Sequence, residues 1–123
     1  GFTRVLAVEG AKYNIKANAI APLALTRMTE SIMGALGDKL DPGLVSPLVA
    51  FLGHDDCPVS GQVFSVGGGR VAQVFIGETQ GYYSASLSME DVRDHWGTIT
   101  DRTGYAVPSN LGEETALFIP FFK

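Results

Sequence analysis

The spacing of apolar residues predicts that the chain opens with a helix, from Gly1 to about Tyr13. Asn14 follows, and asparagine tolerates the left-handed conformation that ends many helices. Because its apolar stripe is wide, we expect this helix to be buried on more than one face. The stripe consists of Phe2, Val5, Leu6 and Val8.

A short buried strand is predicted next, from Ile15 to Ala21, with the blurred alternation of a parallel strand covered on both faces. Pro22 cannot donate to a sheet ladder, so we expect the chain to leave the sheet there. Thr26 offers a hydroxyl that can cap a second helix, predicted from Thr26 to about Leu36. Open parallel sheets bind ligands at the carboxyl ends of their strands, so Pro22 to Thr26 is the predicted ligand-lining segment.

A third helix is predicted to start at Asp41-Pro42, a capping carboxylate followed by proline, and to end at Gly53. A strand over Gln62–Val66 and a strand-like run over Arg70–Ile76 then flank the triplet Gly67–Gly69. Phosphate loops need glycines at fixed spacing that open a helix, so the triplet is interpreted as a tight connection. The buried face of the third helix is expected to be formed by Leu44, Leu48, Phe51 and Leu52.

The last part of the chain carries a helix-start signal, with Ser88 as the cap, Asp91 as its capping-box partner and Leu87 as a hydrophobic staple. The helix should run to about Asp101, with Trp96 as a core anchor. The apolar tail over residues 116–122 is expected to pack, since it would otherwise be an exposed patch.

The composition of the chain argues against several classes of function. The 123 residues are 46% hydrophobic and 18% charged, which is enough apolar material for one domain's core. The net charge of −4 gives no electrostatic footprint for nucleic acid or an anionic membrane surface. No apolar run approaches the ~20 residues of a membrane span, so a soluble chain is expected. Cys57 cannot form an internal disulfide, and His54 and His95 are expected to be solvated rather than metal ligands.

Several motifs together resemble a known family. Asn18-Ala-Ile-Ala-Pro22 followed by Thr26-Arg-Met28 resembles the segment after the sixth strand of the short-chain dehydrogenase/reductase family, where the loop covers the nicotinamide end of NAD(P). Three later segments follow in the order seen in the (3R)-hydroxyacyl-CoA dehydrogenase unit of peroxisomal multifunctional enzyme type two and its bacterial relatives. These segments are Ser46–Val49, Gly61–Gly69 and Glu90–Trp96.

The resemblance implies an α/β fold, the C-terminal part of a doubly wound (Rossmann-like) parallel sheet with a C-terminal strand and helix extension. Residues 1–76 would be the C-terminal half of the Rossmann-like domain, and residues 77–123 an extension packing on it. The first helix would lie at a dimer interface, so a homodimer or tetramer is expected. The remaining N-terminal half of the same protein would be a further partner.

The implied activity is oxidation of a 3-hydroxyacyl-CoA-type alcohol by hydride transfer to NAD or NADP, with a tyrosine as base assisted by a lysine. No such Tyr-x-x-x-Lys pair occurs in the chain, since Tyr13 and Lys16 have the wrong spacing. We therefore expect the pair to lie before Gly1, and this chain alone to be inactive. A non-catalytic pseudo-dehydrogenase or dimerisation module is the alternative. The chain ends without a Ser-Lys-Leu peroxisomal address, so a cytoplasmic location is expected.

The resemblance also implies site residues. The cofactor would be contacted mainly through backbone groups, with Thr26 bonding the carboxamide. Leu23 stands where the wider family has glycine, and leucine avoids positive φ, so the loop should follow a path of its own. Met28 and Met33 are expected either to flank the acyl chain or to pack in the core. The expected cofactor-binding residues are Pro22, Leu23, Ala24, Leu25 and Thr26.

Overall fold

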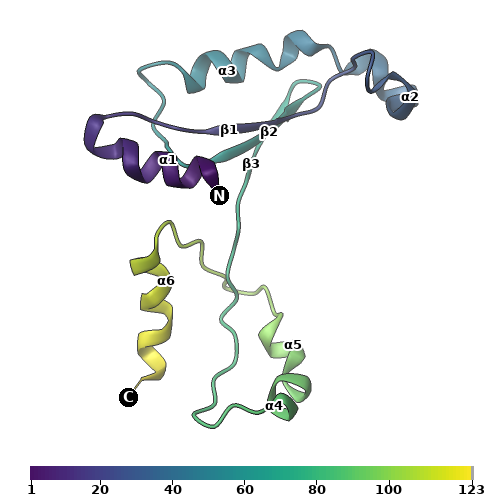
Figure 1. Cartoon of the computed structure of the whole chain (residues 1–123). Helices are drawn as coiled ribbons and strands as arrows, with labels where there is room; N and C mark the ends of the chain where they lie inside the picture. The colour runs from purple at the N-terminus through teal and green to yellow at the C-terminus, as the bar shows by residue number, and fades with distance from the viewer. Residues whose placement is uncertain (123) are drawn as a thin grey trace. The chain divides into compact units, whose positions relative to one another are not determined.

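The computed structural model describes residues 1–122, apart from the side chain of Ala35; Lys123 lies outside the described residues. The chain divides into a first unit, Gly1–Phe75, and a second unit that begins at Ile76 (Figure 1). Among the described residues, no helix has both the length and the apolar character needed to cross a bilayer.

The first unit is built on a sheet of three strands in the order β1 (Ala19–Pro22), β2 (Val63–Gly67) and β3 (Arg70–Val74). β1 and β2 run parallel, with Ala19 opposite Val63, whereas β2 and β3 are antiparallel. Helical segments lie between β1 and β2 along the chain, as Figure 1 shows. The predicted α/β class, with a parallel pair of strands, is confirmed.

The predicted bounds of the first strand are wrong at both ends. Residues 15–18 precede the sheet. Gly61 donates its N–H to the carbonyl of Ala17 at 2.7 Å, and the Asn18 side chain donates to the carbonyl of Val59 at 3.0 Å and accepts from the Gln62 N–H at 3.1 Å. Pro22 is the last residue of β1 rather than the first outside it. The N–H groups of Ala19 and Leu23 point toward β2, so the nitrogen of Pro22 faces the other edge and its missing hydrogen removes no bond to β2.

The first helix is α1 (Phe2–Gly10), continued by a 3₁₀ turn over Ala11–Tyr13. Asn14 ends it in the left-handed conformation, with φ of 56°, as predicted. The expected burial is wrong for the chain by itself: Phe2 is 77% and Val8 68% exposed. Val5 is 53% exposed as well, so most of the apolar stripe is uncovered within the described residues.

The predicted second helix is wrong in length. The chain makes a turn after Thr26, then forms α2 (Glu30–Met33) and a 3₁₀ helix over Gly34–Lys39. Gly34, with φ of 46°, interrupts the α-helical path. Thr26 does not cap the helix, because Thr29 occupies the N-cap position.

The third helix starts as predicted, with the Asp41 carboxylate accepting the Gly43 N–H at 2.8 Å. Its first turn is a 3₁₀ helix over Pro42–Leu44, and α3 (Ser46–Leu52) follows. Of its predicted buried face, Leu48 is buried and Leu52 half-buried. Leu44 and Phe51 are exposed, so that part of the prediction is wrong for the chain alone.

The glycine triplet forms a tight hairpin, as interpreted from the sequence. Gly68 and Gly69 have φ of 56° and 80°, and two positive values are characteristic of the type I′ turn that joins antiparallel strands. β3 follows at once, so no helix opens on these glycines. The interpretation of the triplet as a tight connection is therefore confirmed.

The second unit contains α4 (Met89–Asp94), α5 (Trp96–Ile99), α6 (Leu111–Phe118) and a 3₁₀ turn over Ile119–Phe121. The capping box is confirmed: Ser88 accepts the Asp91 N–H at 3.1 Å, and Asp91 accepts the Ser88 N–H at 3.0 Å. The predicted continuous helix is interrupted at His95, whose ψ of 15° breaks the helical path.

Two side-chain predictions for the second unit are wrong. Trp96 is 59% exposed and does not anchor a core within the chain. His95 is half-buried rather than solvated, because its ring stacks on Tyr82 with centroids 3.9 Å apart. The apolar tail is also largely exposed, although Leu117 is half-buried and Phe121 stacks on Tyr83.

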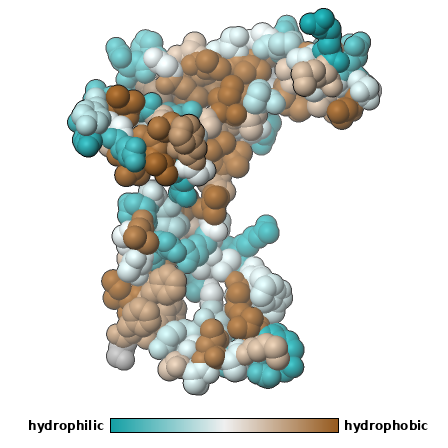
Figure 2. Space-filling view, viewed as in Figure 1, coloured by the Kyte–Doolittle hydropathy of each residue, from teal (hydrophilic) through white to brown (hydrophobic). Residues whose placement is uncertain are grey.

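The described chain covers little of its own apolar surface. The buried hydrophobic residues are Leu40, Leu48, Cys57 and Val66, which is a small core for a sequence that is 46% hydrophobic. Figure 2 shows hydrophobic residues across the surface of the first unit. Contiguous exposed apolar surface usually marks an interface with another segment or chain.

Candidate functional site

The candidate site is the loop over Pro22–Thr26, which leaves the carboxyl end of β1. The N–H of Leu23 donates to the carbonyl of Val66 at 2.8 Å, so the loop begins hydrogen-bonded to β2. Gly67 makes this approach possible, because a Cβ at that position would lie 2.3 Å from the Leu23 carbonyl oxygen. The loop therefore lies at the carboxyl ends of two parallel strands, the usual ligand position in sheets of this class.

A second anchor holds the middle of the loop. The N–H of Leu25 donates to the carbonyl of Leu40 at 2.8 Å, and Leu40 belongs to the buried core. The Leu25 side chain is half-buried and lies beside Gly37, where an added Cβ would meet it at 3.2 Å. The loop is thus fixed on one side by β2 and on the other by the segment that precedes α3.

Thr29 closes the loop from its far end, a role that the sequence analysis did not assign. Its hydroxyl donates to the carbonyl of Ala24 at 2.8 Å and accepts the N–H of Thr26 at 2.8 Å. The hydroxyls of Thr26 and Thr29 lie 3.2 Å apart. The Thr-x-x-Thr spacing is the signal that could have identified it, since threonine hydroxyls often bond backbone groups three residues away.

The loop leaves few polar groups for a ligand. The N–H of Ala24 makes no hydrogen bond among the described residues, and the exposed Thr26 hydroxyl contacts only Thr29. Leu23 has an ordinary negative φ, since Asn14 is the only non-glycine residue with positive φ in residues 1–122. Leu23 thus avoids positive φ as expected, whereas a loop path different from that of the wider family and contact with a cofactor stay predictions.

The two methionines that were expected near the substrate lie beyond the loop. Met28 is 88% exposed, so the alternative of core packing does not hold for it within this chain. Met33, at the end of α2, is half-buried. The role of both methionines at an acyl chain stays a prediction.

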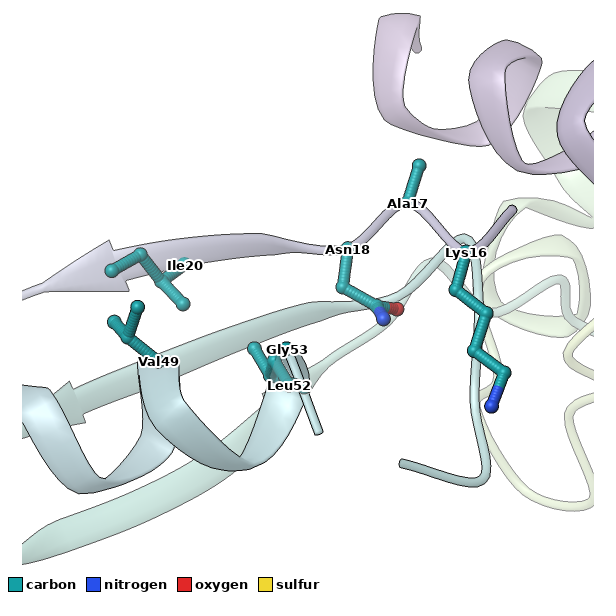
Figure 3. Close-up of a pocket in the computed structure, with 7 residues that line it drawn as sticks. All are labelled: Lys16, Ala17, Asn18, Ile20, Val49, Leu52 and Gly53. Carbon is teal, nitrogen blue, oxygen red and sulfur yellow. The ribbon is translucent and has the colours of Figure 1, made fainter. Parts of the chain in front are cut away.

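A cavity of about 340 Å³ lies at the other end of β1, between the strand and α3 (Figure 3). In Figure 3, Ile20 of β1 and Val49 of α3 point toward one another. Lys16 donates to the carbonyl of Cys57, and the Asn18 amide is bonded to the same loop, so the polar lining groups already have partners. Its position at the amino end of the strand makes this cavity a poor candidate for the ligand site.

The second unit has a cavity of similar volume, about 340 Å³. Two of its polar side chains are bonded to backbone, since Thr79 donates to the carbonyl of Ile99 at 2.6 Å and Gln80 donates to that of Gly104. Most of the remaining lining is aromatic or aliphatic. These residues include Tyr82, Tyr83, Leu87, Leu117, Phe118 and Phe121.

No metal site is found among residues 1–122, where no three histidine, cysteine or acidic residues gather. His54 is exposed, as expected, and lies 3.5 Å from the Asp56 carboxylate. The pKa of Asp91 is lowered from its ordinary value, chiefly by hydrogen bonds from Ser88. That carboxylate serves the start of α4 in the second unit.

The chain is similar in sequence to dehydrogenases and multifunctional enzymes. No profile of a known protein family matches the chain. It is 43% identical over 106 residues to a short-chain type dehydrogenase/reductase of Mycobacterium tuberculosis, covering 85% of this chain and 37% of that protein. It is 37% identical over 120 residues to peroxisomal multifunctional enzyme type 2 of Mus musculus, covering 94% of this chain and 16% of that protein.

A solved structure shares the fold. The structure of full-length peroxisomal multifunctional enzyme type 2 from Drosophila melanogaster matches with a TM-score of 0.80 at 23% identity, covering 98% of this chain and 23% of that one. The chain therefore spans about a third or less of the length of the proteins it matches.

Proposed function

Because its homologues are short-chain dehydrogenases/reductases and peroxisomal multifunctional enzymes of type 2, we propose that this chain is the carboxyl-terminal portion of an NAD(P)-dependent dehydrogenase. The whole protein oxidises a secondary alcohol by hydride transfer. The observation that carries the proposal is the anchored loop over Pro22–Thr26 at the carboxyl ends of β1 and β2. The chemistry of hydride transfer belongs to the nicotinamide, and the loop's part is to hold that end of the cofactor.

The groups that remain available in the loop fit a carboxamide. A carboxamide has one acceptor oxygen and a donor NH₂ group. The N–H of Ala24 can donate to the oxygen, while the Thr26 hydroxyl oxygen can accept from the NH₂. Of the residues expected to touch the cofactor, these two therefore supply the hydrogen bonds, and Pro22, Leu23 and Leu25 supply the backbone frame.

The substrate is proposed to be an acyl-CoA or a similar small molecule with a 3-hydroxyl group. This class rests on the resemblance of three segments to the (3R)-hydroxyacyl-CoA dehydrogenase unit of multifunctional enzymes. These segments are Ser46–Val49, Gly61–Gly69 and Glu90–Trp96. We propose that Met28 and Met33 flank the acyl chain, because methionine adapts to irregular apolar ligands. Met28 follows the loop by two residues and is exposed. The tyrosine and lysine that act on the hydroxyl proton belong to another part of the protein.

The unpaired edge of β1 is proposed to pair with another segment of protein. Among the described residues, β1 pairs with β2 alone, so its other edge presents unpaired backbone groups. The small buried core and the exposed face of α1 require additional cover. We assign the strand edge to the N-terminal half of the same protein and the α1 face to a second subunit in a homodimer or tetramer.

The alternative function is a non-catalytic dimerisation module or pseudo-dehydrogenase. It is favoured by the exposed apolar face of α1, which serves assembly whether or not the protein is an enzyme. The two functions differ in the rest of the protein. The enzyme has a Tyr-x-x-x-Lys pair ahead of this segment, and the module has lost it.

The test uses the whole protein that carries this segment. It is mixed with a 3-hydroxyacyl-CoA and either NAD or NADP, and formation of the reduced nicotinamide is followed by absorbance. Turnover with one cofactor, and none with residues 1–123 alone, is the expected result. A whole protein that binds neither cofactor would contradict the proposal and favour the non-catalytic module. The cytoplasmic location and the two domain ranges stay predictions.

A further inference from the structure

We infer that Thr29 is a positioning residue for the nicotinamide carboxamide, acting through Thr26 and the backbone of Ala24. The inference rests on the proposed function and deepens it, because it states which residue gives the loop its ligand-binding polarity. Thr29 itself is half-buried behind the loop, while Thr26 is exposed on it. Its role is therefore to orient groups that touch the cofactor, without touching it.

The Thr29 hydroxyl has one proton and two acceptor sites. The shortest contact for its proton is the carbonyl of Ala24, at 2.8 Å, compared with 3.3 Å to the carbonyl of Thr26. The oxygen also accepts the N–H of Thr26 at 2.8 Å. One acceptor site is then left, and the neighbour that can fill it is the Thr26 hydroxyl, 3.2 Å away.

This proton count fixes the direction of the contact between the two hydroxyls. Since the Thr29 proton is given to Ala24, the Thr26 hydroxyl must donate to Thr29. The lone pairs of the Thr26 oxygen are then free to accept a hydrogen bond. The loop consequently presents one acceptor, at Thr26, and one donor, the N–H of Ala24.

The same bonds fix the backbone between the two groups. Thr29 holds the carbonyl of Ala24 and the N–H of Thr26, and the N–H of Leu25 between them is held by the carbonyl of Leu40. With three consecutive residues bonded, the spacing of the donor and the acceptor is set before the cofactor arrives. Such preorganisation lowers the cost of ordering the loop on binding.

The test replaces the hydroxyl of Thr29 by a methyl group of similar size, in the whole protein. Thr29→Val should weaken NAD(H) binding by about tenfold, the scale of one or two net hydrogen bonds. Thr29→Ser keeps the hydroxyl and should bind within about threefold of the parent protein. Thr115→Val is the matched control, because it also removes a threonine hydroxyl that donates to a backbone carbonyl, that of Leu111 at 2.8 Å.

Binding of ADP-ribose, which lacks the nicotinamide, separates positioning from a general loss of structure. Thr29→Val should bind ADP-ribose as the parent does, and Thr26→Val, at an exposed position, should show the same selective loss of NAD(H). Because Thr29 acts through Thr26, the double variant should lose little more than either single variant.

The possible outcomes are distinct. A parent protein that binds no NAD(P) overturns the proposed function and this inference together. A parent that binds, with Thr29→Val equal to it for NAD(H), overturns the inference alone. Equal weakening of NAD(H) and ADP-ribose by Thr29→Val also overturns it, because the residue would then support the fold generally.

Discussion

Replacement of Gly67 by alanine tests whether β2 and the candidate loop are packed as closely as described. The new Cβ would lie 2.3 Å from the Leu23 carbonyl oxygen and 2.9 Å from the Leu23 Cβ. Non-bonded carbon atoms normally keep about 3.5 Å or more, so the loop or the strand must move by roughly 1 Å. Overpacking of this kind costs about 1–3 kcal/mol.

The displacement falls on the peptide that begins the loop, so two measurements should change together. In urea unfolding of the whole protein, Gly67→Ala should lower the free energy of unfolding by about 1–3 kcal/mol without altering the slope. Cofactor binding should weaken as well, because the carbonyl that moves is two residues from the bond between Leu25 and Leu40.

Gly53→Ala is the matched control. A Cβ there would lie 3.6 Å from the carbonyl of Val49, an ordinary contact, and the φ of Gly53 is −89°. Its free energy of unfolding should change by less than about 0.5 kcal/mol. Equal unfolding midpoints for Gly67→Ala and the parent protein would refute the close packing of the loop on β2.

Two further predictions concern the second unit. The Asn110 side chain accepts the Glu113 N–H at 3.0 Å at the start of α6, so Asn110→Ala should destabilise that helix by about 1 kcal/mol, whereas Asn110→Asp should not; faster amide exchange confined to α6 would support this, and unchanged exchange would contradict it. Hydrogen bonds from Ser88 hold the pKa of Asp91 below its ordinary value of 3.8, so its stabilising effect is present above that pH and is lost as the pH falls through the lowered pKa. An NMR titration should show the Asp91 pKa rising in Ser88→Ala, and an identical pKa in both proteins would count against the capping box.

Local signals in the sequence predicted the features that depend on neighbouring residues. The left-handed Asn14, the capping carboxylate of Asp41 and the Ser88–Asp91 box are each set by one or two side chains and nearby backbone. The tight turn at Gly67–Gly69 was likewise predicted from the residues directly after it, which have the pattern of a strand rather than of a helix. Such features need no knowledge of distant segments.

Features that depend on distant segments were predicted less well. The first strand begins only at Ala19, whose partner Val63 is more than forty positions away and is not indicated by local spacing. Burial was overestimated for Trp96 and for the face of α1, since apolar spacing indicates a face to be covered without saying which chain covers it. Thr29 was missed because its role appears only when the chain turns back toward Ala24.

The central claim is that the loop over residues 22–26, held by Thr29, receives the nicotinamide end of a cofactor in the whole protein. Amide hydrogen exchange of the whole protein, with and without NAD(H), tests it most directly. The account predicts slower exchange over residues 22–29 when the cofactor is bound, and little change in α6. Cofactor binding that leaves exchange over residues 22–29 unchanged would contradict it.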